Sequence, residues 1–163
     1  MKTLLRTLLY LALIVWLGAE IFFFIVAPIT FTTLHPDTHT AGMIVGQLIR
    51  ILHGMGLVSG MIALAVLAQA AACGVYKPRA VLAPMALILL MAAFTLYSQF
   101  SIVPAMERDR IAAGGTIDAA DATNSSRIDF NKLHSRSENV EGMILLFGLA
   151  TVVLVARAET TKN

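Results

Sequence analysis

The chain has 163 residues, 58% hydrophobic and 13% charged, with a formal net charge of +2 and a mean hydropathy of +0.79. Soluble domains carry about 25% charged residues and could not bury this much apolar surface, so the composition indicates a membrane protein. No basic stripe with interleaved aromatic residues is present, which argues against nucleic-acid binding, and the single Cys73 excludes an internal disulfide.

The first apolar span covers about residues 4–28 and follows two basic residues, Lys2 and Arg6. Its apolar run exceeds the 7–15 residues of a typical signal peptide, so we predict a retained transmembrane helix. Pro28 and, in the third span, Pro104 are interpreted as helix ends, because proline cannot continue a hydrogen-bonded turn.

Three further spans cover about residues 46–72, 81–103 and 126–156, where the last includes a polar turn before its apolar core. A helix needs roughly 20 apolar residues to cross the bilayer. We predict an all-α fold, an integral membrane four-helix bundle that forms one transmembrane domain over residues 1–163. An extracytoplasmic loop is expected at about residues 105–125.

Gly56 and Gly60 form a small-xxx-small pair in the second span. Such pairs let two helix backbones approach closely. We interpret this pair as an intramolecular packing site. Trp16 lies one turn before Glu20, and we interpret it as a packing residue against the interior that Glu20 faces.

The distribution of basic residues predicts the orientation. With four spans, both termini share one side. Six basic residues on that side lie in short segments near span ends: Lys2, Arg6, Lys77, Arg79, Arg157 and Lys162. The positive-inside rule applies best to such segments, so we expect both termini in the cytoplasm, in a bacterial inner membrane.

The two halves of the chain share an order of motifs that predicts a duplicated helical hairpin. The first and third spans both end in a Phe-x-x-x-Pro run, at 24–28 and 100–104. The second and fourth open with similar segments that place His53 and His134 at equivalent positions. Parallel repeats of this kind are related by an axis along the membrane normal.

Polar residues within the spans are concentrated at one depth. The helices alternate in direction, so these residues all fall in the half of the membrane opposite the termini. The set consists of Glu20, Gln47, Arg50, His53, Gln99, His134, Glu138 and Glu141. Ionisable residues inside a membrane are costly and need a partner or a task.

Spacing predicts how this cluster assembles. His134, Glu138 and Glu141 follow an i, i+4, i+7 pattern and share one helix face. We expect that face to point into the bundle, towards Glu20, Arg50 and His53. Glu20, Arg50 and Gln99 are predicted to form a structural ion-pair network.

Three interpretations of the cluster stay open. It is a network of ion pairs that fixes helix register, or a ligand site, or an ion or proton path. In a ligand site, His53 and His134 could bind haem b, or join Glu138 and Glu141 around a transition metal. The path is the least favoured, because no polar residues continue into the other half of the membrane.

Three segments together resemble the transmembrane protein 205-like domain, a four-helix membrane domain that is uncharacterised in bacteria. They are WLGAEIFFFIVAPITF, AGMIVGQLIRILHGMG and FNKLHSRSENVEGMILLFGL. The best-matching positions are Trp16, Gly18, Pro28, Phe31, Ala41, Gly42, His53, Leu133 and His134. The resemblance implies an integral membrane location and no established reaction.

We predict a non-enzymatic membrane protein in which the cluster binds haem or a metal ion, as an accessory subunit of a redox complex. The alternative is a structural or interaction subunit of a larger membrane complex, and a cation transporter is the least favoured function. The expected partners are the lipid bilayer and other membrane-protein subunits.

Overall fold

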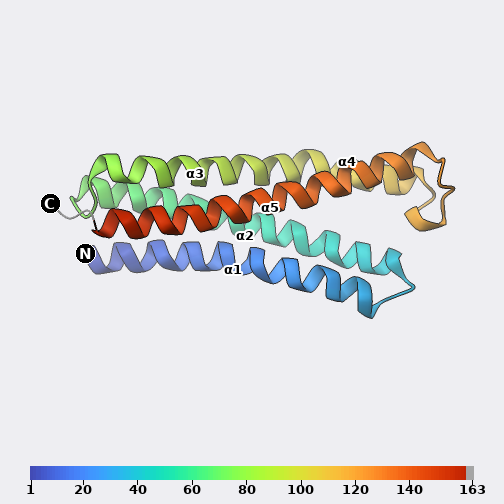
Figure 1. Ribbon diagram of the computed structural model, residues 1–163, viewed down its shortest axis with the longest axis horizontal. Helices are drawn as coiled ribbons and strands as arrows, with labels where there is room; N and C mark the ends of the chain where they lie inside the picture. Colours follow the sequence, from blue (N-terminus) through green and yellow to red (C-terminus); the bar gives the residue numbers. More distant parts are fainter. Residues whose placement is uncertain (161–163) are drawn as a thin grey trace.

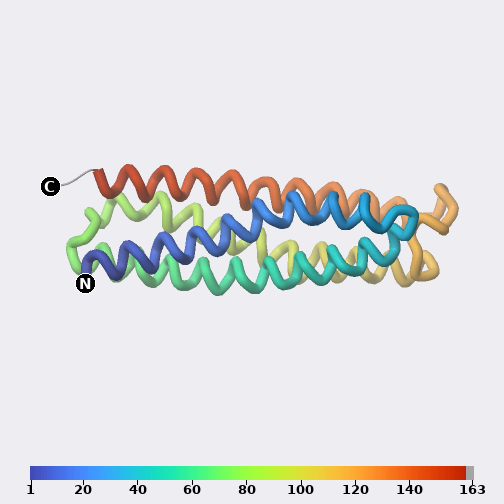
Figure 2. The backbone as a smooth tube through the Cα atoms, turned by 90° about the horizontal axis from the view of Figure 1, so that it is seen from below, coloured from blue at the N-terminus to red at the C-terminus, as the bar shows by residue number. Residues whose placement is uncertain are grey.

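The computed structural model describes residues 1–160 as a bundle of long helices that run side by side (Figure 1). The elements, in chain order, are α1 (Lys2–Thr33), α2 (Thr38–Ala72), α3 (Pro78–Tyr97), η1 (Ser98–Ile102), α4 (Val103–Ala112), η2 (Ile117–Ala119) and α5 (Ser125–Thr160). Figure 2 shows that α1 begins and α5 ends at the same end of the bundle, which we call the terminal end. The predicted all-α four-helix bundle is confirmed.

Four helical segments are long and apolar enough to cross a membrane: 2–33, 38–72, 78–112 and 125–160. Their outward faces carry large exposed apolar side chains, such as Phe22, Leu82 and Leu146. Lipid is the solvent in which such surfaces are stable. The protein is therefore a small polytopic integral membrane protein.

Neither Pro28 nor Pro104 ends a helix, so that prediction is wrong. α1 continues past Pro28 to Thr33, and the third segment continues through Pro104 to Ala112. Transmembrane helices tolerate proline when local adjustments accommodate the lost hydrogen bond. For Pro104 the adjustment is the π-helical turn η1, directly before α4. The loop is correspondingly shorter than predicted and covers residues 113–124.

The helices form two hairpins, α1–α2 and α3/α4–α5. α1 packs mainly on α2, and α3 packs mainly on α5. Towards the loop end, the α1–α2 hairpin diverges from α4 and α5 in Figure 1, and a hydrogen bond from the Thr38 hydroxyl to the Asp118 carboxylate links α2 to the loop. The two hairpins therefore pack against each other in the middle of the bundle and at its terminal end, and are farther apart at the end that carries the 113–124 loop.

Trp16 packs into the interior, as the sequence predicts, and there it joins α1 to α2. Its side chain is 1% exposed and lies flat against two glycines. A Cβ atom on Gly56 would lie 2.5 Å from Trp16 Nε1, and one on Gly60 would lie 2.6 Å from Trp16 Cζ3. Both distances are too short for a real contact, so the close approach of the two helices requires glycine at these positions.

At the terminal end, the short α2–α3 connection is tied to α5. The Tyr76 hydroxyl donates a 3.0 Å hydrogen bond to Glu159 Oε1, and Arg6 Nε lies 3.5 Å from the same oxygen. Burial and, secondly, the Glu159 carboxylate raise the pKa of Tyr76 to about 12. This cluster holds α1, α5 and the connection together.

The Trp16 contact predicts that Gly56→Ala destabilises the protein by about 1–3 kcal/mol, because the added methyl group forces the indole to move. Thermal unfolding in mild detergent measures the effect. Gly54→Ala is the matched control, since no atom lies within 4 Å of a Cβ atom added at that position. Equal melting temperatures for the two variants would contradict this packing.

Stability should also fall at alkaline pH. The folded state holds Tyr76 neutral up to a pKa of about 12, whereas an unfolded tyrosine ionises near pH 10. The contribution is therefore complete below about pH 10 and is lost as the pH rises towards about 12. Melting curves recorded from about pH 9 to about pH 12 should show a smaller decline for Tyr76→Phe than for the wild type.

Candidate functional site

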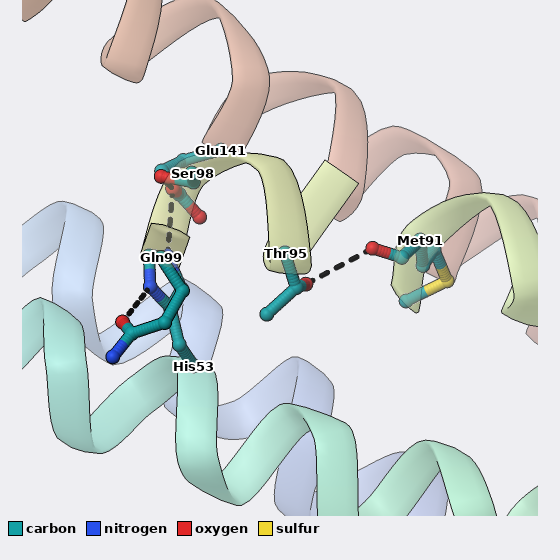
Figure 3. Close-up of polar contacts among 6 residues, drawn as sticks. All are labelled: His53, Met91, Thr95, Ser98, Gln99 and Glu141. Atoms are coloured by element: carbon teal, nitrogen blue, oxygen red, sulfur yellow. Dashed lines mark hydrogen bonds and ion pairs between the residues drawn. The ribbon is translucent and has the colours of Figure 1, made fainter. Parts of the chain in front are cut away.

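The centre of the polar cluster is a buried contact between His53 on α2 and Glu141 on α5. His53 Nε2 lies 3.0 Å from Glu141 Oε1, and the side chains are 0% and 2% exposed. The contact joins the two hairpins in the interior of the bundle. Figure 3 shows both residues beside the π-helical turn η1.

The turn η1 supplies a second hydrogen-bond partner to each residue of this pair. The Gln99 amide oxygen lies 2.8 Å from His53 Nδ1, and the Ser98 hydroxyl donates a 3.0 Å hydrogen bond to Glu141 Oε1. Two adjacent residues thus contact two different helices (Figure 3). Single π-helical turns inside α-helices frequently occur at functional sites.

These contacts define where one proton lies. An amide oxygen can only accept a hydrogen bond, so His53 Nδ1 carries the hydrogen that points to Gln99. The Nε2 atom and Glu141 Oε1 then share one further proton across 3.0 Å. With that proton on either atom, the pair is neutral overall, as a histidinium with a carboxylate or as a neutral histidine with a carboxylic acid.

A second carboxyl group, Glu20 on α1, completes the site. Glu20 is 1% exposed and fully enclosed by the bundle, and it lies within electrostatic range of Glu141. One oxygen of each carboxyl group, Oε2, is buried with no hydrogen-bond partner. Trp16 Nε1, one turn before Glu20, is also buried without a hydrogen bond of good geometry, and the Glu20 carboxyl group is the acceptor that it faces. Buried polar atoms without partners are rare in proteins and call for an explanation.

The structure does not bring His134 or Glu138 into this site. Their side chains are 47% and 65% exposed, and they pair with each other across 3.4 Å. His134 lies seven residues before Glu141, about 10 Å along α5, towards the end where the hairpins diverge (Figure 1). The two histidines therefore do not occupy the equivalent depths that the repeat had predicted.

The predicted ligand sets are not assembled as single sites. Across residues 1–160, no three His, Cys, Asp or Glu side chains are arranged to hold a metal ion. The members of the predicted metal set, His53, His134, Glu138 and Glu141, divide between the interior and the surface. The same division separates the two predicted haem ligands, His53 and His134.

The predicted ion-pair network also differs from the observed contacts. Arg50 is exposed on α2, and the ion pairs among residues 1–160 do not include one between Arg50 and Glu20. A long arginine side chain can lay its apolar stem along neighbouring residues and keep its charged group at the surface. Gln99 is in the cluster as predicted, but it binds His53.

Sequence reasoning missed Ser98 and the π-helical turn that presents it. One signal was available. Pro104 stands within an otherwise continuous helical pattern, and prolines and π-helical turns are the usual causes of local helix distortion. A serine or glutamine one to two turns before such a proline is a reasonable candidate for a re-aimed polar side chain.

The sequence matches one family model, that of the domain of unknown function DUF4149, over residues 11–110. The chain belongs to this family. No curated protein and no solved structure matches it.

The DUF4149 match includes four members of the cluster: Glu20, His53, Ser98 and Gln99. Glu141 lies beyond the matched residues. The matched region therefore covers one hairpin and the first arm of the second, and α5 brings the buried carboxyl group that closes the site.

Burial distinguishes the two histidines in a mutational test. His53→Ala leaves Glu141 and Gln99 buried without their partner, and we expect it to destabilise the protein by about 3–5 kcal/mol. His134→Ala removes an exposed side chain and should change stability by no more than about 0.5 kcal/mol. Unfolding in mixed detergent micelles measures both, and similar losses would place the two histidines in similar environments, against the structure.

Proposed function

We propose that this DUF4149 protein is a non-enzymatic membrane protein that holds an exchangeable proton at its buried His53–Glu141 pair. Glu20 acts as a second acid beside the pair. The observation that carries the proposal is the pair of buried carboxyl oxygens, Oε2 of Glu20 and of Glu141, that lack partners.

A network of ion pairs that only fixes helix register does not explain why these two carboxyl oxygens are buried without partners. A carboxylate inside hydrocarbon is costly unless it is paired, and His53 can balance the charge of only one of two. The other carboxyl group is accommodated without a counter-charge if it binds a proton. Two acids and one imidazole within one buried site therefore suit the uptake, sharing and release of protons.

We further propose that the protein works as an accessory or interaction subunit beside another membrane protein. Between the cluster and the terminal end, the core of residues 1–160 is lined mainly by apolar side chains such as Leu9, Leu13, Leu67 and Ile88. The buried hydroxyl groups of Thr95 and Thr151 in this region donate to backbone carbonyls of their own helices. A chain of proton carriers would need titratable groups along that length. The proposed site thus exchanges protons with one side of the membrane or with a partner.

The proposal places the protein in a bacterial inner membrane with both termini in the cytoplasm. The support is the group of lysines and arginines close to helix ends at the terminal end, among them Lys2, Arg6, Lys77 and Arg79. Lys162, which the sequence assigns to the same group, lies outside the described residues. Basic residues near helix ends concentrate on the cytoplasmic side. On this orientation, the His53 site lies nearer the outer face.

A haem or transition-metal cofactor stays a prediction of the sequence and is not part of this proposal. His53 already uses both ring nitrogens for Gln99 and Glu141, so a metal would have to displace one of them. The resemblance to the transmembrane protein 205-like domain likewise stays a prediction. A Soret band or a stoichiometric metal in purified protein would favour a cofactor over a proton.

Infrared spectroscopy of the protein in lipid bilayers tests the proton site. We expect the carbonyl stretch of a neutral carboxyl group, with slow hydrogen–deuterium exchange because the site is buried. Glu20→Gln or Glu141→Gln should remove or shift this band, since each variant deletes one of the two acids that share the site.

The matched control is Glu138→Gln, which changes an exposed carboxyl group on the same helix as Glu141. The band should be unaffected in this variant. A band absent from the wild type, or equally strong in all three variants, would assign the cluster to charge pairing and packing alone.

A further inference from the structure

The terminal end carries a pocket that is separate from the His53 site by about 21 Å along α1. Its volume is about 420 Å³. All four long helices or their ends contribute to its lining. Three of its lining side chains are cationic, Lys2, Arg6 and Lys77, and one is acidic, Glu159. The pocket therefore attracts anions.

Arg6 is held in place at this pocket but leaves hydrogen-bond donors unused. Its guanidinium carbon lies 5.9 Å from the centre of the Tyr76 ring, and its Nε atom is 3.5 Å from Glu159 Oε1. That distance is too long for a hydrogen bond, and the buried Nε atom has no hydrogen-bond partner. Arginine presents its five donors in a planar fork that suits the oxygens of a phosphate group.

An apolar groove lies along α1 and α5, two of the helices that line the basic pocket. It has a volume of about 280 Å³ and is lined by Tyr10, Leu13, Ile14, Leu17, Gly18, Ile21 and Val152. Tyr10 lies one helical turn from Arg6, so the groove starts where the basic pocket ends. From Tyr10 to Ile21 it extends about 16 Å.

We infer that the basic pocket binds the phosphate group of an anionic phospholipid, with one acyl chain in the adjoining apolar groove. The shared chemistry of the site is that of a phosphate anion bound by Arg6, Lys2 and Lys77. The groove favours a lipid over free phosphate, because an acyl chain is stabilised by contact with the apolar surface and a soluble anion is not. Basic pockets between transmembrane helices are a recurrent form of site for anionic head groups.

Native mass spectrometry of the full chain, released from mild detergent, tests this site with phosphatidylglycerol and phosphatidylcholine as probes. We expect one phosphatidylglycerol per chain and weaker binding of the zwitterionic lipid. Arg6→Gln combined with Lys77→Gln should weaken phosphatidylglycerol binding by at least about tenfold, because the loss of a single charge-assisted hydrogen bond accounts for about that factor.

The control removes the same number of charges at the other end of the bundle, in Arg108→Gln with Lys132→Gln. Both residues are exposed, and this variant should bind phosphatidylglycerol like the wild type. Circular dichroism of each variant establishes that it is folded. Equal binding in the two double variants, or no preference for phosphatidylglycerol over phosphatidylcholine, would overturn the proposal.

A third variant separates the lipid from a soluble phosphate. Gly18→Leu places a large side chain in the groove, which Gly18 lines, and the first atom of that side chain has room, since no atom lies within 4 Å of a Cβ atom at this position. It should weaken phosphatidylglycerol binding and leave binding of inorganic phosphate, measured by calorimetry, unchanged. Unchanged phosphatidylglycerol binding in Gly18→Leu, together with tight binding of inorganic phosphate, would assign the pocket to a soluble anion and reject the lipid.

Discussion

The contact between His53 and Glu141, at 3.0 Å, joins the two hairpins of this protein through polar groups in the interior of a largely apolar bundle. Within hydrocarbon, apolar side chains pack on one another little better than they pack on lipid. Interactions that depend on a unique alignment of helices therefore have a large influence on register. This contact, with Gln99 and Ser98, favours the relative position of α2, α5 and the η1 turn in which all four side chains are hydrogen-bonded.

Within the first hairpin, the contact of Trp16 with two glycines sets how α1 and α2 pack. The indole occupies the space that side chains at Gly56 and Gly60 would fill, so α1 and α2 approach closely along a flat aromatic surface. Glu20 lies one turn further along the same face of α1 as Trp16. Packing thus brings the second carboxyl group to the His53–Glu141 pair, although the ion pairs of residues 1–160 do not include Glu20. The close packing of Trp16 and the burial of Glu20 are parts of one arrangement.

The two ends of the bundle differ in chemistry. The terminal end is closed by Tyr76, Glu159 and Arg6 and surrounded by further basic residues. At the loop end, acidic and basic residues alternate, and local pairs such as Glu107 with Arg110 neutralise each other. The buried proton site that we propose lies between these ends, nearer the loop end. A protein of this form has a defined interior site and a defined lipid-facing surface, which suits a subunit that operates beside other membrane components.

The sequence by itself determined the fold class and the number of apolar spans, because these follow from the lengths of the apolar runs. It also placed the buried polar residues towards the end of the bundle opposite the termini, because consecutive helices alternate in direction. Glycine spacing also identified the α1–α2 packing site. Tertiary structure alone decided which polar residues meet. Helical periodicity placed His134, Glu138 and Glu141 on one face, but it could not show that α5 meets α2 at Glu141 and leaves His134 at the surface. The π-helical turn likewise depends on the balance between a proline and its packed neighbours, so its effect on Ser98 and Gln99 is visible only once the helices are in place.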